Sequence, residues 1–394
     1  MADLSYRVVT PQPTTEMSGF TSFKRIPALD GLRGIAISLV LLWHTVFQAN
    51  FTHHPLLNRM VGIGHLSWSG VDLFFVLSGF LIGGILLDNR NSPRYFSTFY
   101  LRRAYRIFPL YFLVVVLCWI AFQAGSHGWT PYGRMDLFKG HAPWWTVFTL
   151  TQNLWMAQLG GFAGASLSVT WSLAIEEQFY LTLPFTVRHL NAKHLLYLVV
   201  GVICAAPLLR AYLIQHSPSG GFAAYVLTPC RADALALGVL CAILVRKPRY
   251  WNLLLTRRVW LGIATAVLGI GVLWITYMSY PLFSGPLFGL EYTVLALFYS
   301  CILLGALTAG QLLKGLLCNR ILTTLGSIAY GTYLLHYICI NAVIFLLIRA
   351  TPLPVTAVYL GGPLLGVILA IAIASVSWRI FEQPLVRRAQ TYRY

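Results

Sequence analysis

The chain has 394 residues, of which 58% are hydrophobic and 10% are charged, and its formal net charge is +17. Because soluble domains carry about 25% charged residues, this composition excludes an ordinary soluble protein and indicates a multi-pass membrane protein. The preference of cytoplasmic loops for Lys and Arg explains the positive charge, so we expect no nucleic-acid partner.

The apolar runs predict an all-α, polytopic membrane helix bundle of about ten transmembrane helices. Residues 1–26 are polar, show no cleavable signal peptide and are expected to form a cytoplasmic N-terminal tail. Residues 27–384 are expected to form the membrane domain, followed by a basic cytoplasmic tail at 385–394. The expected spans are 33–50, 69–87, 105–124, 171–188, 195–214, 229–245, 259–278, 290–312, 327–349 and 355–380.

The run 144–158 is apolar but short, and Thr149, Gln152 and Asn153 interrupt it. We therefore expect a re-entrant or interfacial segment rather than a span. With ten spans and a cytoplasmic N-terminus, the basic loops all face the cytoplasm, whereas an eleventh span here would invert every later loop. Both termini are thus expected inside the cell, with the chain in the inner (cytoplasmic) membrane. The basic residues behind this prediction are Arg90, Arg94, Arg102, Arg103, Arg106, Arg188, Lys193, Arg246, Lys247, Arg249, Arg257, Arg258, Lys314, Arg320, Arg387, Arg388 and Arg393.

Two ionisable residues, Arg33 and His44, mark the first span. Eleven helical steps of about 100° bring both to one face, about 16 Å apart along the axis. Arg33 is then near the cytoplasmic surface and His44 lies deep in the membrane, where ionisable groups are costly and usually functional. A neutral imidazole there is suited to taking a proton from a hydroxyl. The alternative is an interfacial arginine and a histidine bonded to a neighbouring helix.

Two further arginines, Arg103 and Arg106, are three residues apart and share a helix face at the cytoplasmic entrance. Paired guanidinium groups suit phosphates, which they bind through bidentate hydrogen bonds. Arginine is also common at cytoplasmic helix ends, so topology alone is an alternative explanation.

Two adjacent carboxylates, Glu176 and Glu177, lie in an apolar run that continues to Tyr180. The chain has only 11 Asp and Glu residues, and two of them within a membrane helix indicate a site. Only one can face a given direction, so the other needs its own partner. Either glutamate could hold the tautomer of His44 and stabilise its imidazolium form.

Other polar residues within the spans have a structural explanation as well as a functional one. Asp72 enters the second span from the outer side, where it could orient a histidine, bind an acceptor sugar or cap the helix. Arg231 begins a later span from the same side, Tyr333 and His336 share a helix face, and Glu382 ends the last span. The seven cysteines show no paired spacing, so we expect neither disulfides nor a metal site.

Together these stretches resemble the family-three membrane acyltransferases, bacterial integral-membrane enzymes that O-acylate cell-envelope sugars and some small natural products. The matching motifs run in the family's order from about residue 27 to 384. They are Leu-Asp-Gly-Leu-Arg-Gly with the Arg33-x10-His44 spacing, Gly-Val-Asp-Leu-Phe-Phe-Val-Leu-Ser-Gly-Phe, Arg-Arg-Ala-Tyr-Arg-Ile-Phe-Pro, Trp-Ser-Leu-Ala-Ile-Glu-Glu-Gln-Phe-Tyr, Arg-Ala-Asp-Ala-Leu-Ala-Leu-Gly and Phe-Glu-Gln-Pro.

The resemblance implies an acyl-CoA donor, with acetyl-CoA first, that binds from the cytoplasm, and a carbohydrate acceptor on the outer side. It implies His44, Glu176 and Arg33 as catalytic candidates, and it implies that Arg33, Arg103 and Arg106 meet the CoA phosphates. Some family members carry an esterase-like domain that completes the transfer; we expect none in this chain. Whether the acyl group moves directly or through a separate extracytoplasmic transferase, and whether the chain forms a homo-oligomer, stays open. The candidate substrate-binding residues are Arg103, Arg106, Asp72, Glu177, Tyr180 and Arg231.

We therefore predict a membrane O-acyltransferase in which His44, oriented by Glu176 or Asp72, takes the proton of the acceptor hydroxyl. A covalent acyl-histidine is the mechanistic variant. The acceptor could be a lipopolysaccharide sugar, peptidoglycan, an exopolysaccharide or a small natural product such as a macrolide. Two other classes stay open: a proton-coupled sugar or lipid transporter, and a non-catalytic partner of a polysaccharide machine.

Overall fold

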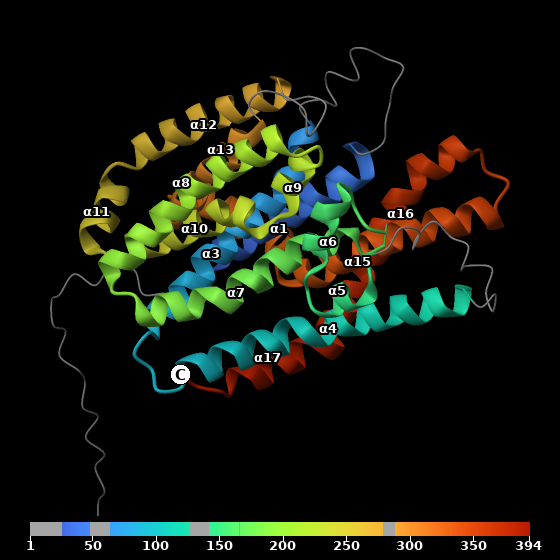
Figure 1. The fold of residues 1–394 in the computed structure, drawn as a ribbon, viewed down its shortest axis with the longest axis horizontal. Helices are drawn as coiled ribbons and strands as arrows, with labels where there is room; N and C mark the ends of the chain where they lie inside the picture. Colours follow the sequence, from blue (N-terminus) through green and yellow to red (C-terminus); the bar gives the residue numbers. More distant parts are fainter. Residues whose placement is uncertain (1–25, 48–63, 127–141, 165, 279–287) are drawn as a thin grey trace, which may run out of the picture.

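The computed structural model describes residues 26–47, 64–126, 142–164, 166–278 and 288–394, so the predicted N-terminal tail lies almost wholly outside the described residues. Within these ranges all regular structure is helical, which confirms the predicted all-α class. Most of the long helices lie side by side with similar axis directions (Figure 1). The long helices are α1 (Pro27–Leu42), α3 (Gly70–Asp88), α4 (Tyr95–Ser126), α7 (Trp171–His189), α8 (Ala192–His216), α10 (Thr228–Val245), α12 (Arg258–Met278), α13 (Phe288–Leu307), α15 (Arg320–Ala350) and α16 (Val355–Ser377).

Short helical segments connect or extend these long helices. Two of them are π-helical turns, a rare form that occurs mostly as single turns and often at functional sites. They are η1 (Trp43–Phe47), which continues α1, and η5 (Trp378–Glu382), which continues α16. The remaining segments are η2 (His65–Ser69), α5 (Trp144–Phe148), α6 (Gln152–Leu159), η4 (Ser168–Thr170), α9 (Gly220–Val226), α11 (Pro248–Thr256), α14 (Gln311–Leu317) and α17 (Gln383–Gln390).

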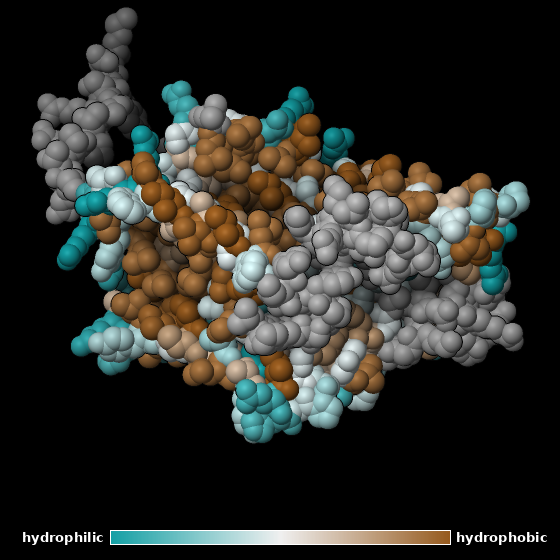
Figure 2. All heavy atoms as spheres, turned by 90° about the horizontal axis from the view of Figure 1, so that it is seen from above, coloured by the Kyte–Doolittle hydropathy of each residue, from teal (hydrophilic) through white to brown (hydrophobic). Residues whose placement is uncertain are grey.

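Nine helices in the described part of the chain are long and apolar enough to cross a bilayer, so the protein is a multi-pass membrane protein. The remaining predicted span, 171–188, corresponds to α7, which is 19 residues long but carries Glu176, Glu177 and Arg188 and is therefore less apolar. Apolar side chains cover much of the outer surface in Figure 2. Examples are Leu208 on α8 at 72% exposure and Ile270 on α12 at 68%, as expected for surfaces in contact with lipid.

The segment 144–158 forms two short helices, α5 and α6, of five and eight residues. At about 1.5 Å per residue neither can cross the membrane, in agreement with the prediction. Buried amides fix α6 in place: Gln152 donates to the carbonyl oxygen of Thr170 over 2.9 Å, and Asn153 donates to that of Val226 over 3.2 Å. Gln178 on α7 donates to the side chain of Asn153 over 2.9 Å. The polar residues that interrupt this run therefore bind α6 to the bundle.

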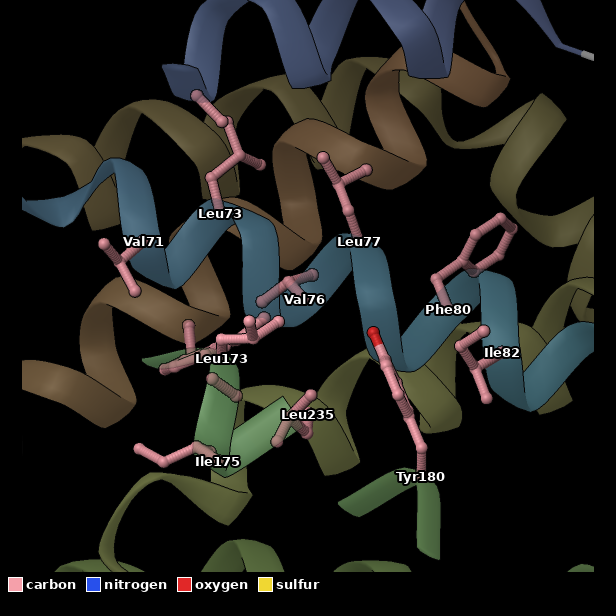
Figure 3. Close-up of a cluster of buried hydrophobic side chains, with 14 of the residues drawn as sticks. Val71, Leu73, Val76, Leu77, Phe80, Ile82, Leu173, Ile175, Tyr180 and Leu235 are labelled. Atoms are coloured by element: carbon pink, nitrogen blue, oxygen red, sulfur yellow. The ribbon is translucent and has the colours of Figure 1, made fainter. Parts of the chain in front are cut away.

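Close helix contact at the centre of the bundle depends on glycine. Helices α3 and α10 meet where a Cβ atom at Gly79 would lie 2.0 Å from the carbonyl oxygen of Leu235. A Cβ atom at Gly238 would lie 2.2 Å from that of Val76. Figure 3 shows the apolar cluster around this contact, with side chains from α3, α7 and α10 and the hydroxyl of Tyr180 directed toward α3. This packing fixes α3 and α7, which carry residues of the candidate site.

We expect Gly238→Ala to lower the melting temperature in detergent, because the added methyl group forces the α3 and α10 backbones apart. Overpacking of this kind costs about 1–3 kcal/mol. The matched control is Gly262→Ala on α12, where no atom lies within 4 Å of the added Cβ and alanine favours helix. An equal decrease in both variants would mean that helix contact at Gly238 is not the cause.

Several basic residues meet at one end of the bundle. The Arg90 side chain donates to the carbonyl oxygens of Arg188 and Leu190, and Arg188 donates back to that of Arg90. Arg246, at the end of α10, pairs with Asp88, at the end of α3, over 2.6 Å. The ends of α3, α7 and α10 are therefore on one side, in keeping with the predicted clustering of positive charge. At the C-terminus, α17 packs against α4.

Candidate functional site

An arginine-lined cavity, called the arginine cavity below, lies between α1, α3, α4, α7, α15 and η5. It has about 910 Å³ of empty space, its opening included. Three guanidinium groups line it: Arg33 from α1, and Arg103 and Arg106 from successive turns of α4. Two carboxylates, Glu176 and Glu382, line it as well. The three predicted phosphate-binding arginines therefore share one cavity, although they come from different parts of the chain.

The arginines of the arginine cavity have different neighbours. The Nη1 atom of Arg33 lies 3.1 Å from a carboxylate oxygen of Asp30, one helical turn earlier, which orients this guanidinium group. The guanidinium group of Arg103 lies 5.7 Å from the ring centre of Tyr180, close enough for a cation–π contact. Several arginines around one partly enclosed space are suited to an anion with more than one phosphate group.

The two adjacent glutamates point to different places. Glu176 lines the arginine cavity and accepts a 2.7 Å hydrogen bond from the hydroxyl of Ser78 on α3. Glu177 lines a separate hollow beside α4, and its Oε1 atom is buried without a hydrogen-bond partner. Tyr180 borders both spaces. The structure thus brings Glu176 and Tyr180 to the arginine cavity and directs Glu177 away from it.

A second cavity, called the His44 cavity below, contains the other predicted catalytic group. It has about 780 Å³ of empty space, its opening included. Val71 and Tyr333 line both cavities and form the boundary between them. The Tyr333 hydroxyl is fixed there, because it donates to the carbonyl oxygen of Val169 over 2.9 Å and lies 2.6 Å from the hydroxyl of Ser172. The aromatic residues around the His44 cavity are Trp43, Trp68, Phe162, Tyr225, Tyr292, Tyr333 and Tyr337.

The geometry of His44 identifies its basic nitrogen. His44 lies in the π-helical turn η1, and its Nδ1 atom is 2.9 Å from the carbonyl oxygen of Val40. A carbonyl oxygen can only accept, so Nδ1 carries the proton in this hydrogen bond. In the neutral ring Nε2 then has the free lone pair and can act as a proton acceptor.

The ring of His44 packs against two rings of α15. The ring centre of His336 lies 4.8 Å from that of His44, and that of Tyr337 lies 5.1 Å away, both in edge-to-face arrangements. Within the described residues, neither Asp72 nor Glu176 is hydrogen-bonded to His44. The predicted carboxylate orientation of His44 is therefore absent from this structure, because Asp72 pairs with Arg231 and Glu176 bonds to Ser78.

Asp72 and Arg231 form a fully buried ion pair across α3 and α10, with 2.5 Å between their closest atoms. Asp72 makes no hydrogen bond as a helix cap, and neither residue lines the two cavities. The guanidinium group of Arg231 instead lies 3.9 Å from the ring centre of Tyr292, which lines the His44 cavity. The pair therefore supports the wall of the His44 cavity from behind.

Two features of this arrangement were not predicted. Arg210 on α8 is fully buried and pairs with Asp233 over 2.8 Å, beside the Asp72–Arg231 pair. Trp43 and Trp68 also line the His44 cavity. In the sequence, Trp43 directly precedes His44 and Trp68 lies four residues before Asp72, and this closeness is the signal that could have pointed to them. The partner of Arg210 lies on another helix, α10, and a motif does not specify such a pairing.

A family model described as an acyltransferase domain matches residues 26–379. The chain is 27% identical over 393 residues to "Putative peptidoglycan O-acetyltransferase YrhL" of Bacillus subtilis, covering 93% of this chain and 56% of that protein. It is 32% identical over 201 residues to peptidoglycan O-acetyltransferase OatA of Listeria monocytogenes, covering 46% of this chain and 28% of that protein. It is 25% identical over 337 residues to acyltransferase MdmB of Streptomyces mycarofaciens, covering 80% of this chain and 79% of that protein.

The chain thus spans about half the length, or less, of the first curated relatives. No solved structure matches this chain.

Proposed function

Because the chain belongs to the acyltransferase domain family, we propose that it is a membrane O-acyltransferase. It would move an acyl group, acetyl first, from cytoplasmic acyl-CoA to a hydroxyl of a cell-envelope carbohydrate. The observation that carries this proposal is the junction of two unlike cavities at Val71 and Tyr333. The arginine cavity suits a phosphate-bearing donor, and the His44 cavity holds a histidine suited to activate a hydroxyl. Two relatives named for peptidoglycan O-acetylation support the acceptor class.

In this proposal the arginine cavity binds the donor. Arg33, Arg103 and Arg106 hold the CoA phosphates, while the pantetheine arm reaches toward Tyr333 and brings the thioester to the boundary between the cavities. In this proposal the arginine cavity opens to the cytoplasmic side of the inner membrane. Arg90, Arg188 and other basic residues meet at one end of the bundle, and basic residues favour the cytoplasmic side. Residues 27–384 form the transferase domain, and residues 385–394 lie on its cytoplasmic side.

A single histidine, His44, can carry the proton from the acceptor hydroxyl to the departing CoA thiolate. The acceptor hydroxyl gives its proton to Nε2 of His44 as its oxygen attacks the thioester carbonyl carbon. A C–O bond forms, the C–S bond breaks, and the departing CoA thiolate receives the proton from the imidazolium. Glu176 lies in the arginine cavity, where it accepts the hydrogen bond from Ser78, so in this proposal it acts beside the donor rather than on His44.

We expect Arg106→Ala to raise the KM for acetyl-CoA by about tenfold with a smaller change in kcat, because a charge-assisted hydrogen bond is worth about 1.5–3 kcal/mol. Initial rates of acceptor-dependent CoA release, measured while acetyl-CoA is varied, separate the two constants. Arg94→Ala, at an exposed arginine just before α4, is the control and should behave as wild type. An unchanged donor KM in Arg106→Ala would remove the phosphate role.

A further inference from the structure

The His44 cavity differs from the arginine cavity in charge. Among the described residues that line it there is no Asp, Glu, Lys or Arg, whereas three arginines and two glutamates line the arginine cavity. The guanidinium group of Arg231 lies behind the Tyr292 ring and is already paired with Asp72. A negatively charged ligand in the His44 cavity would therefore lose its hydration without gaining a counter-charge, which is strongly unfavourable at membrane depth.

The walls of the His44 cavity are mainly aromatic, and one wall carries an unused donor. Trp68 is 5% exposed, and its Nε1 atom has no hydrogen-bond partner. A buried indole N–H usually finds a partner, and Trp68 lines the His44 cavity, so a ligand oxygen that reaches this wall would supply the missing partner. The Trp68 ring centre lies 6.1 Å from that of Tyr225 and 5.6 Å from that of Tyr292, both edge-to-face, so the three rings form one continuous aromatic surface.

These observations fit one class of ligand. A pyranose ring has apolar C–H faces that pack on aromatic rings, and hydroxyl groups at its edge that need hydrogen-bond partners. The aromatic surface suits the faces, the Nε1 atom of Trp68 suits a hydroxyl oxygen, and Nε2 of His44 suits the hydroxyl that reacts. A carboxylate or phosphate on the same ring would find no Lys or Arg among the described lining residues.

We propose that the His44 cavity is the acceptor subsite and that it selects an uncharged sugar ring, with Trp68 donating a hydrogen bond to one of its hydroxyls. This inference rests on the proposed function for the identity of the reaction, but ring selection is a property of the cavity itself. Any charged part of a larger acceptor stays outside this cavity. Trp68 is then a specificity-determining residue rather than a catalytic one.

The test compares two probes with the same ring, methyl β-D-glucoside and methyl β-D-glucuronide, on the purified full-length chain in lipid nanodiscs. With acetyl-CoA present, we expect kcat/KM for the glucoside to exceed that for the glucuronide by about tenfold or more, because the carboxylate has no counter-charge. Trp68→Phe keeps an aromatic ring but loses the donor, so it should raise the KM for the glucoside and leave the KM for acetyl-CoA unchanged. Trp145→Phe, at a tryptophan that is 62% exposed outside both cavities, is the matched control.

A second readout separates this inference from the proposed function. Without any acyl donor, the glucoside should raise the melting temperature more than the glucuronide does, and Trp68→Phe should reduce that shift. This result, if no acetyl-CoA turnover is seen, would support the sugar subsite and refute the donor assignment. Equal use and equal binding of the two probes, or a Trp68→Phe effect confined to the acetyl-CoA KM, would overturn the inference.

Discussion

Replacing His44 with alanine is expected to reduce acceptor-dependent acyl transfer by about 10²- to 10⁴-fold, the range that a positioned general base contributes. The hydrogen bond from Nδ1 to the carbonyl oxygen of Val40 leaves Nε2 as the proton acceptor, and no second histidine lines the His44 cavity among the described residues. The loss should appear in kcat. Binding of acetyl-CoA, measured by thermal shift, should persist because the arginines that hold it line the other cavity.

The matched control for His44 is His216→Ala. This histidine is exposed at the end of α8, where its ring lies 4.4 Å from that of Tyr212, outside both cavities. The His216→Ala variant should transfer acyl groups at the wild-type rate. A folded His44→Ala protein with wild-type kcat would refute both the general-base mechanism and the acyl-histidine variant. A variant that also loses acetyl-CoA binding would instead point to damage that spreads beyond the His44 cavity.

The local part of this site could be predicted from the sequence because helical spacing decides it. Arg103 and Arg106 are three residues apart on α4, and both line the arginine cavity as their common face requires. Arg33 and His44 both line cavities from the α1–η1 segment, Arg33 the arginine cavity and His44 the His44 cavity. The adjacent pair Glu176 and Glu177 diverges, as two neighbouring residues on one helix must.

The long-range part of the site could not be predicted, because side-chain partners depend on how helices pack. Asp72 was expected near His44 or an acceptor, yet its carboxylate binds Arg231, which lies 159 residues later. His336 packs against His44 because α15 crosses α1 at glycines such as Gly34 and Gly326, where an added Cβ would overlap backbone atoms. No spacing rule identifies such a crossing.

Breaking the buried ion pair is expected to give the largest loss of stability. Asp72→Asn leaves the Arg231 guanidinium group at 1% exposure without a counter-charge, and its Nε and Nη1 atoms already have no partners. Removing one member of a buried pair costs about 3–5 kcal/mol. Thermal unfolding in detergent should show a large decrease in melting temperature. Asp88→Asn, at the partly exposed pair with Arg246, should show a smaller decrease because water solvates the remaining charge.

The double variant Asp72→Leu with Arg231→Met decides whether this pair is structural or binds substrate. Replacing both members of a buried pair by apolar residues of similar size is often neutral or stabilising, so the double variant should regain most of the melting temperature that Asp72→Asn loses. If the pair only supports the Tyr292 wall, its kcat per folded molecule stays near the wild-type value. A stable double variant with a strongly reduced kcat/KM for the acceptor would show that Arg231 binds substrate, as the sequence first suggested. Recovery of both stability and activity would assign the charged pair to the fold and leave acceptor recognition to the aromatic wall.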